Sequence, residues 1–297
     1  MSESETPLVS IVIPTYNHAQ FLGRALQSLF NQTYAHWEAI IVDNHSTDNT
    51  DEVIRKFADP RITYLKIHNN GIIAVSRNRG IRAAKGSWVA FLDSDDWWAP
   101  DKLKHCLDHG NENVDVIYHD LEIVGRKKTL FGAKNTESRQ LKKPVIVDLL
   151  ANGSALGNSS VVVRKKVLDC IGAIDESPDM VGCEDYNTWL QIAQITDGFL
   201  YIPQVLGYYF VHQNNNSQRD MSAPLECARA KFDHLLSDRQ RNRYQGRVQY
   251  VFGRSAYCSQ NFIKAKSSLL CSLQYGSVMN KLKSFYMLMS IGIFKKG

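Results

Sequence analysis

Three carboxylates within four positions are the side chains of this sequence best suited to chemistry. Asp93, Asp95 and Asp96 follow directly on the short apolar run 88–92. Like charges this close repel one another, so they need surrounding water or a cation. A hard dication such as Mn²⁺ or Mg²⁺ binds one or two protein carboxylates and completes its coordination with substrate phosphates. A solvated turn that caps the next helix is the alternative, and this segment alone leaves both open.

Alternating strands and helices must position these carboxylates. The apolar spacing predicts strands at 9–14, 38–42, 62–67, 88–92 and 114–118, with helices after Asn17, from about 48, at 76–84 and near 100–109. Because parallel strands need crossover connections, this order predicts an α/β fold with a mostly parallel, Rossmann-like sheet and flanking helices. Ligands of such sheets bind at the carboxyl ends of the strands, so we expect the loops 14–17, 43–48 and 93–96 to meet.

The second half of the chain is less regular. A basic stretch at 125–143 favours either an acceptor lid or a solvated loop, and both stay open. The expected elements are strands at 159–163, 199–203 and 205–212, helices at 165–171 and from 184, and a helical tail from about 225 with loops near 237–243 and 275–279.

The charge is divided unevenly along the 297 residues. Residues 225–297 contain 13 Lys and Arg against three Asp and Glu, whereas residues 1–224 contain 22 against 27. We therefore predict a main domain at 1–224 and a basic helical C-terminal region at 225–297. Two interpretations of this region stay open: a helical domain packed on the body, or an amphipathic surface for an anionic membrane. Because the positive charge is confined to the tail, no nucleic acid is expected as a partner.

The cysteines and the apolar runs bear on location. The six cysteines form no C-x-x-C pair, which favours reduced thiols and a cytoplasmic location. The first seven residues do not have the pattern of a secretory signal, and the run 285–294 is shorter than the ~20 residues that span a bilayer. A peripheral place on the cytoplasmic face of a membrane stays open.

Several segments, in this order, resemble the family-2 type of inverting nucleotide-sugar glycosyltransferases, which have the GT-A fold. The resemblance covers roughly residues 8–215. It is carried by Ser10–Asn17 (SIVIPTYN), Ile41–Asp48 (IVDNHSTD), Ser76-Arg77-Asn78 with Gly80, Ala84-Lys85-Gly86, Leu92–Asp96 (LDSDD), Gly172 with Asp175-Glu176, and Glu184-Asp185. Any one of these is weak, but their shared order is specific.

The resemblance implies a role for each matching residue. The nucleotide base would contact Pro14, Thr15, Tyr16 and Asp43, and Arg77 would lie near the diphosphate. Asp93 and Asp95 would form the metal-binding D-x-D, with Asp95 as the direct ligand. His212 would contact the metal or phosphate, and Asp185 would be the general base. The sequence departs from the family where Asn44 and His45 replace an Asp and a Gly, and where Phe210 replaces an Arg two residues before the His.

Four candidate positions have a structural alternative. Asp185 lies at a predicted helix start, where a carboxylate also caps amides. His212 is equally consistent with a structural histidine. Trp97 and Trp98 suit either a sugar-stacking wall or the core, and we expect at least one of them in the core.

Sugar transfer from a nucleoside diphosphate sugar requires two groups that the resemblance assigns to this sequence. A dication can stabilise the leaving diphosphate, and one carboxylate base can deprotonate the acceptor hydroxyl. One base without a protein nucleophile implies a single displacement with inversion. We therefore predict a hexosyltransferase-type enzyme that moves a sugar, expected to be UDP-linked, to a saccharide or lipid-linked saccharide in surface polysaccharide or glycoconjugate synthesis. A non-catalytic nucleotide-sugar binding protein and a nucleotidyltransferase remain as alternatives, although the Gly-rich phosphate loop of the latter is missing between Val9 and Asn17.

Overall fold

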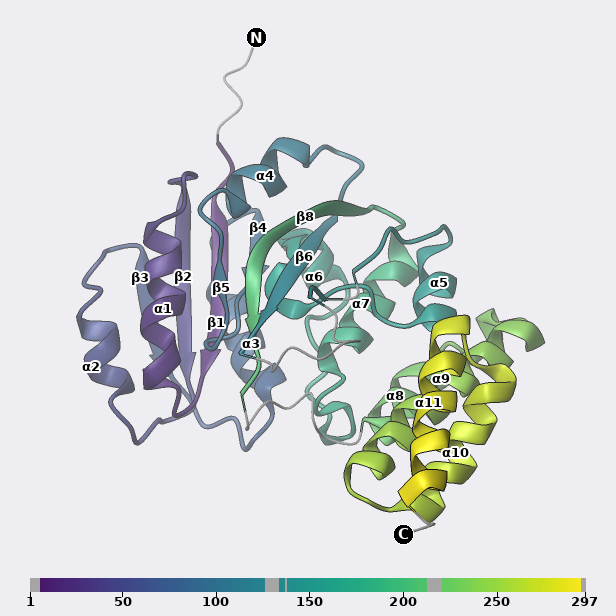
Figure 1. Cartoon of the computed structure of the whole chain (residues 1–297). Coiled ribbons are helices and arrows are strands. Elements are labelled where there is room, and N and C mark those ends of the chain that lie inside the picture. The colour runs from purple at the N-terminus through teal and green to yellow at the C-terminus, as the bar shows by residue number, and fades with distance from the viewer. Residues whose placement is uncertain (1–5, 126–133, 137, 213–220, 295–297) are drawn as a thin grey trace. The chain divides into compact units, whose positions relative to one another are not determined.

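Two compact units make up the chain (Figure 1). The computed structural model describes residues 6–125, 134–136, 138–212 and 221–294. The first unit comprises Met1–Leu141, Ala155–Glu176 and Gln194–Gln213, and the second comprises Lys142–Ser154, Ser177–Ala193 and Asn214–Gly297. The second unit thus joins two internal segments to the predicted tail, and the boundary at residue 224 stays a prediction.

A mixed sheet organises the first unit. Its strands are β1 (Val9–Thr15), β2 (Trp37–Asp43), β3 (Ile62–Lys66), β4 (Trp88–Phe91), β5 (Trp97–Trp98), β6 (Val116–Val124), β7 (Val162–Arg164) and β8 (Phe199–Phe210). They lie in the order β3-β2-β1-β4-β7-β6-β8-β5. The first four are parallel and β6 is parallel to β8, whereas β7 and β5 run antiparallel to their neighbours. The predicted mostly parallel α/β sheet is confirmed, with these two antiparallel additions.

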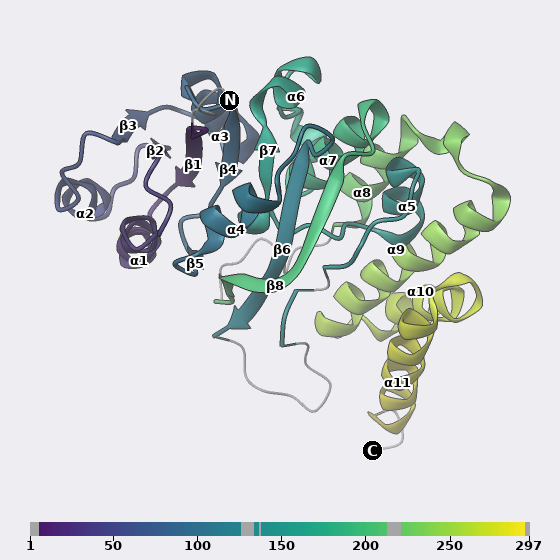
Figure 2. The same ribbon diagram turned by 90° about the horizontal axis from the view of Figure 1, so that it is seen from above.

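Helices cover both faces of this sheet (Figure 2). On one face lie α1 (Ala19–Phe30), α2 (Thr50–Arg55) and α4 (Lys102–His109), and on the other lie α3 (Ile73–Ala83) and α6 (Lys165–Cys170). Because side chains alternate along a strand, Ile11 and Ile13 pack with Leu22 of α1, while Val12 faces α3. A Cβ at Gly80 of α3 would lie 2.5 Å from Val12 Cγ1, so a glycine is required for this close approach.

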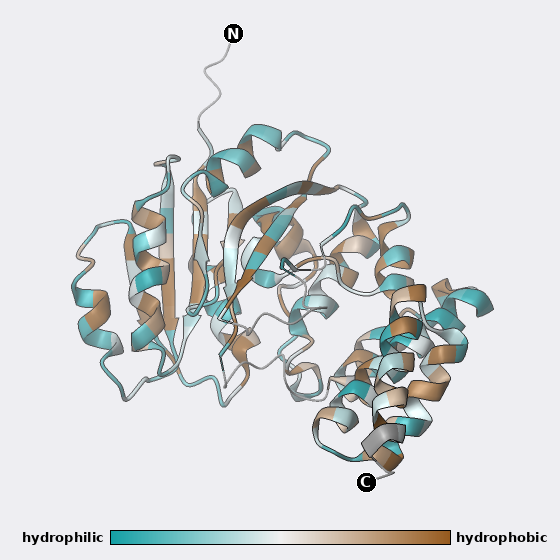
Figure 3. Cartoon of the chain, in the orientation of Figure 1, coloured by the Kyte–Doolittle hydropathy of each residue, from teal (hydrophilic) through white to brown (hydrophobic). Residues whose placement is uncertain are grey.

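The second unit is helical. It contains α5 (Val145–Asn152), most of α7 (Glu184–Ile195), α8 (Ser222–Ala230), α9 (Asp238–Cys258), α10 (Phe262–Tyr275) and α11 (Val278–Phe294). Its buried tyrosines also make hydrogen bonds: Tyr244 Oη donates to Leu225 O at 2.8 Å, and Tyr186 Oη donates to Leu149 O at 3.0 Å. In Figure 3 brown and teal residues alternate along α9, α10 and α11, as amphipathic helices require. Within the described ranges, no helix is both long and apolar enough to cross a bilayer.

Four local predictions need correction. The strands expected at 199–203 and 205–212 form one strand, β8, because a register shift opposite His119 and Asp120 accommodates Pro203, which has no N–H to donate. The segment 158–160 forms a 3₁₀ turn, and only 162–164 forms the strand β7. The loop expected at 237–243 is instead the first turn of α9, where Ser237 and Gln240 form a capping box. Helix α5 was missed. Part of the predicted loop 125–143 lies outside the described residues.

Candidate functional site

The three polar loops predicted to meet are joined by hydrogen bonds. They follow β1, β2 and β4, which are parallel neighbours and therefore end at one edge of the sheet. The loop after β1 contacts the loop after β2 where Asn17 N–H donates to Ser46 Oγ at 2.8 Å. It also contacts the loop after β4, where His18 Nδ1 and Ser94 Oγ form a hydrogen bond of 2.8 Å. Burial lowers the pKa of His18.

Asn17, after which the sequence predicts a helix, does not cap α1. Its backbone has a φ of 50°, and its side-chain oxygen accepts from Thr47 N–H at 2.8 Å. The carboxylate of Asp48 caps the helix instead, since Ala19 N–H donates to Asp48 Oδ2 at 2.9 Å. The cap thus comes from a different loop, 29 positions away, which sequence spacing could not reveal.

Asp43, at the end of β2, is fully buried and already hydrogen-bonded. Its carboxylate accepts from Ser46 N–H at 3.0 Å and from Tyr64 Oη at 2.9 Å. Burial, with hydrogen bonds to Asp51 and Asp43, raises the pKa of Tyr64 well above its ordinary value, so the phenol stays protonated. Asp43 therefore anchors its own loop, and any contact with a base adds to these bonds.

The segment after β1 changes from buried to exposed. Pro14 and Thr15 are buried at the strand end, whereas Tyr16 is 53% exposed. Among the described residues, Thr15 Oγ1 is a buried hydroxyl without a hydrogen-bond partner. Of these three residues, which the resemblance assigns to the base together with Asp43, only Tyr16 offers a ring face to solvent.

Asp93 forms an ion pair with Arg77. Arg77 Nη2 donates to Asp93 Oδ1 at 2.8 Å, and Asn158 Nδ2 donates to the same oxygen at 3.0 Å. The Arg77 side chain is only 4% exposed, whereas that of Asp93 is 28% exposed. The guanidinium that the resemblance places near the diphosphate is thus buried and paired, and the carboxylate is the group of this pair that solvent reaches.

Asp95 is hydrogen-bonded to His212. The distance between Asp95 Oδ2 and His212 Nε2 is 3.0 Å, and both side chains are largely buried. Burial and the neighbouring Asp93 carboxylate raise the pKa of Asp95. The imidazole ring of His212 packs on Phe21, with ring centroids 4.8 Å apart. Asp95 and His212, predicted as metal contacts, thus lie side by side.

Arg24 of α1 holds the backbone of the acidic loop. Its Nη2 donates to Asp95 O at 2.9 Å, and its guanidinium lies 3.5 Å from the ring centroid of Trp97 and 4.6 Å from that of Phe210. Phe210 stands where many family members have an Arg, and here it stacks on a guanidinium supplied by α1. Trp98 is buried, which confirms that at least one of the two tryptophans belongs to the core.

Asp96 has a structural environment. It is 1% exposed and accepts from Ser159 Oγ at 2.6 Å and from Phe210 N–H at 3.0 Å. Burial and the carboxylates of Asp95 and Asp93 raise the pKa of Asp96 well above its ordinary value. Of the three carboxylates, Asp96 therefore ties the loop to β8, and Asp93 and Asp95 remain for chemistry.

A dication fits the residues present. Asp95 and His212 supply an oxygen and a nitrogen donor, both of which Mn²⁺ accepts. In the part of the chain that the structure describes, no group of three or more His, Cys, Asp or Glu side chains is arranged to hold a metal ion. Two protein donors suit a cation that completes its coordination with substrate phosphates.

Asp185 belongs to the second unit, in the first turn of α7. Its Oδ1 accepts from Tyr186 N–H at 2.6 Å, while the buried Glu184 accepts from Gly182 N–H at 2.7 Å. Both carboxylates therefore bond to amides at the helix start, as the structural alternative predicts. The assignment of Asp185 as a base stays a prediction.

Sequence reasoning missed several residues that build this site. They are His18, Arg24, Asp48, Ser94, Asn158 and Ser159, all of which bond to the three loops or to the acidic cluster. A weak signal existed for Arg24, which is a charged residue within the apolar pattern of α1. No such signal marks Asn158 and Ser159, whose positions depend on β7 pairing with β4.

A sequence model described as "Glycosyl transferase family 2" matches residues 10–172. Among curated proteins, a putative teichuronic acid biosynthesis glycosyltransferase, TuaG of Bacillus subtilis, is 41% identical over 104 residues, 34% of this chain and 41% of that protein. An uncharacterized glycosyltransferase of Nostoc sp. is 32% identical over 73% of this chain and 69% of its own length.

A third relative carries a fuller description. It is UDP-Glc:alpha-D-GlcNAc-diphosphoundecaprenol beta-1,3-glucosyltransferase WfgD of Escherichia coli, which is 32% identical over 62% of this chain and 69% of its own length. The match to TuaG thus spans less than half of that protein, whereas the matches to the other two span about two thirds of theirs.

Two solved structures share the fold. S. aureus TarS in complex with UDP-GlcNAc has a TM-score of 0.64 at 16% identity, over 95% of this chain and 89% of that one. The mannosyltransferase PcManGT from Pyrobaculum calidifontis, in complex with GDP-Man and Mn²⁺, has a TM-score of 0.64 at 18% identity, over 98% of this chain and 80% of that one. The expected GT-A fold is confirmed.

Proposed function

Because the chain belongs to glycosyl transferase family 2 and is a glycosyltransferase, we propose that it moves a hexose from a nucleoside diphosphate sugar to an acceptor hydroxyl with inversion. One observation carries the proposal. At the carboxyl edge of the parallel strands, Asp93 and Asp95 lie two positions apart in one loop, where Asp95 is bonded to His212 and Asp93 to Arg77 of α3. The two pairs combine cation donors with a guanidinium, and a diphosphate requires both.

We take the donor to be UDP-linked. TarS is described in complex with UDP and with UDP-GlcNAc, and the name of WfgD specifies UDP-Glc. In this proposal Pro14, Thr15, Tyr16 and Asp43 receive the base, and Tyr16 supplies the exposed ring. Arg77, held by Asp93, donates to the diphosphate.

Asp95 and His212 would hold Mn²⁺ or Mg²⁺, in keeping with the Mn²⁺ described for PcManGT. When bound, the cation supplies Lewis-acid stabilisation for the leaving diphosphate. The chain's own part is to keep Asp95 in position. Arg24 does this by donating to the Asp95 carbonyl. The neighbouring residue, Asp96, is anchored by the hydrogen bonds that its carboxylate accepts from Ser159 and Phe210.

Asp185 is proposed as the general base that takes the proton of the acceptor hydroxyl. A positioned carboxylate base contributes roughly 10²–10⁴-fold to the rate. With no covalent intermediate on the protein, the acceptor oxygen bonds to the anomeric carbon as the bond to the diphosphate breaks, and the configuration inverts.

We propose a lipid-linked saccharide as the acceptor and surface polysaccharide synthesis as the role. WfgD is named for a diphosphoundecaprenol-linked sugar, and TuaG for teichuronic acid biosynthesis. The predicted cytoplasmic location goes with this proposal.

The test measures which nucleotide product is released. The purified chain is incubated with UDP-, GDP- and dTDP-sugars, Mn²⁺ and a diphosphate-linked N-acetylglucosamine lipid, and the products are separated by chromatography. We expect a nucleoside diphosphate and a glycosylated lipid. Release of pyrophosphate would favour a nucleotidyltransferase, and donor binding without any release would favour a binding protein.

Two variants separate the proposed roles. Asp185→Asn should lower turnover at least about 100-fold while calorimetric binding of the donor stays unchanged, since a base acts only in the chemical step. Asp95→Ala should lose the Mn²⁺-dependent part of donor binding. Activity of Asp95→Ala that survives EDTA would exclude the proposed metal role.

A further inference from the structure

Helix α11 carries an apolar stripe that the described residues leave open to solvent. The stripe consists of side chains that are 54 to 77% exposed, namely Val278, Met279, Leu282, Phe285, Tyr286 and Met289. At about 100° per residue these positions cover about 120° of the helix circumference. The opposite side of α11 is used for packing, since Ile291 is buried in a cluster with Ala256, Ala265 and Leu269 of α9 and α10. The helix therefore has two apolar faces, and one of them is exposed.

Lysines border the stripe on both sides. By the same periodicity Lys281 and Lys283 each lie about 40° beyond one edge of it. Residues 261–297 contain six lysines and no Asp or Glu. A broad apolar face with basic flanks is typical of a helix that lies in the interface of an anionic membrane, with lysine stems reaching up to the phosphates.

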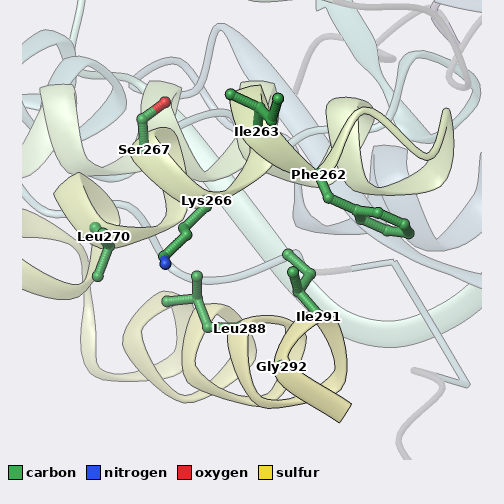
Figure 4. Close-up of a pocket in the computed structure, with 8 residues that line it drawn as sticks. All are labelled: Phe262, Ile263, Lys266, Ser267, Leu270, Leu288, Ile291 and Gly292. Carbon is green, nitrogen blue, oxygen red and sulfur yellow. The ribbon is translucent and has the colours of Figure 1, made fainter. Parts of the chain in front are cut away.

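An apolar groove runs between α10 and α11 (Figure 4). It measures about 470 Å³, and its lining includes Phe262, Leu270, Leu288 and Ile291. Lys266 extends from α10 into this groove toward Leu288 (Figure 4). Gly292, which also lines it, follows Phe285 by two helical turns, so the groove borders the stripe. An apolar groove with one ammonium group suits a phospholipid, whose acyl chain would lie in the groove while its phosphate contacts the ammonium group.

We propose that α10 and α11 form a docking surface for an anionic phospholipid membrane. The stripe lies among the acyl chains next to the headgroups, and Lys266, Lys281 and Lys283 contact the lipid phosphates. The proposal goes beyond the reaction, because membrane binding needs neither donor nor acceptor. A membrane surface is also where a lipid-linked acceptor resides.

Charge favours the membrane over a second copy of the chain. A two-fold contact between two α11 stripes would bring their flanking lysines together. Neither helix has a carboxylate to offset that repulsion, and like charges facing across an interface are costly. An anionic lipid surface instead supplies the missing negative charge.

Vesicle flotation of the full chain, without any donor, tests the proposal. We expect the protein to float with vesicles that contain about 30% phosphatidylglycerol and to bind at least about tenfold more weakly to pure phosphatidylcholine. Leu282→Gln/Phe285→Gln should weaken anionic-vesicle binding at least about tenfold, since both side chains insert. Lys281→Gln should weaken it about fivefold and leave binding to neutral vesicles unchanged.

A matched control replaces an exposed apolar residue elsewhere. Ile195, at the end of α7, is 54% exposed, and Ile195→Gln should float like the wild type. Thermal unfolding of every variant should match the wild type, because Leu282, Phe285 and Ile195 are exposed and Lys281 is only partly buried. Equal flotation of wild type and Leu282→Gln/Phe285→Gln would overturn the proposal. A second result would also overturn it: the wild-type chain does not float, light scattering shows that it is a dimer, and Leu282→Gln/Phe285→Gln converts that dimer to a monomer.

Discussion

The ion pair between Arg77 and Asp93 links α3 to the end of β4. The guanidinium is nearly inaccessible, and it donates to Asp93 Oδ1, which also accepts from Asn158. An exposed pair of similar length, Lys104 with Asp108 at 2.8 Å on α4, offers a direct comparison within one protein. Burial rather than distance distinguishes the two pairs.

Removal of Asp93 should therefore cost far more than removal of Asp108. We expect Asp93→Ala to lower the free energy of unfolding by about 3 kcal/mol, because it removes the carboxylate that faces a buried guanidinium. Asp108→Ala should leave the free energy of unfolding nearly unchanged, since water screens the exposed pair. Urea unfolding of both variants measures the difference, and equal losses would contradict the role of burial.

His119 of β6 should make stability depend on pH. Burial and the positive charge of Lys102 lower the pKa of His119 to about 3. Between that value and its ordinary 6.5, the unfolded chain binds a proton that the folded chain does not, so this contribution to stability falls as the pH falls below 6.5. From pH 6.5 to pH 5 the loss should reach about 2 kcal/mol.

The variant His119→Gln tests this pH dependence. It should be less stable near pH 7, but the part of the slope due to His119 should disappear between pH 6.5 and 5. Urea unfolding at several pH values measures both slopes. An unchanged slope in the variant would assign the acid sensitivity to other groups.

At the scale of elements, one carboxylate caps two helices. Asp48 accepts from Ala19 N–H at the start of α1 and from Thr50 N–H at the start of α2, at 2.9 and 3.1 Å. The bonds connect the loops after β1 and β2 and fix the directions in which both helices leave the candidate site. A side chain that serves two helices should matter more than an ordinary cap.

Asp48→Ala should lower the free energy of unfolding by about 2 kcal/mol, the upper end for loss of a helix cap. Asp48→Asn retains one acceptor oxygen and should lose about half as much. Thermal and urea unfolding compare the two variants. A loss below about 0.5 kcal/mol for Asp48→Ala would mean that water replaces both caps.

At the scale of the whole molecule, the second unit is assembled from three stretches of chain. Tyr186 Oη of α7 donates to the carbonyl oxygen of Leu149 in α5. The guanidinium carbon of Arg247, in α9, lies 5.6 Å from the ring centroid of Tyr186. Tyr186 is 3% exposed. Residues on both sides of the predicted boundary at 224 therefore share one packed unit.

A fragment of residues 1–224 should not unfold as cooperatively as the full chain. Its α5 and α7 lose α9, so apolar surface around Tyr186 becomes exposed. Circular dichroism melts and binding of a hydrophobic dye compare the fragment with the full chain. A sharp melt at the same temperature and no dye binding would instead support 1–224 as an independent domain.

The sequence alone determined the parallel half of the sheet and the edge at which its loops meet. Continuous apolar runs and crossover rules act over short segments, so the fully buried strands β1 and β4, and the position of Asp95 after β4, follow from local pattern. The family motif likewise depends only on order along the chain.

Only the tertiary structure decided which side chains support that motif. Asp48 caps a helix 29 positions away, Ser159 reaches Asp96 from the 3₁₀ turn before β7, and Arg24 stacks on Phe210, which occupies an expected arginine position. The single strand β8 and the helix α5 were decided in the same way. The physical reason is that hydrogen bonds and stacking act through space over a few ångströms, and residues distant in sequence reach that range only after the sheet has formed.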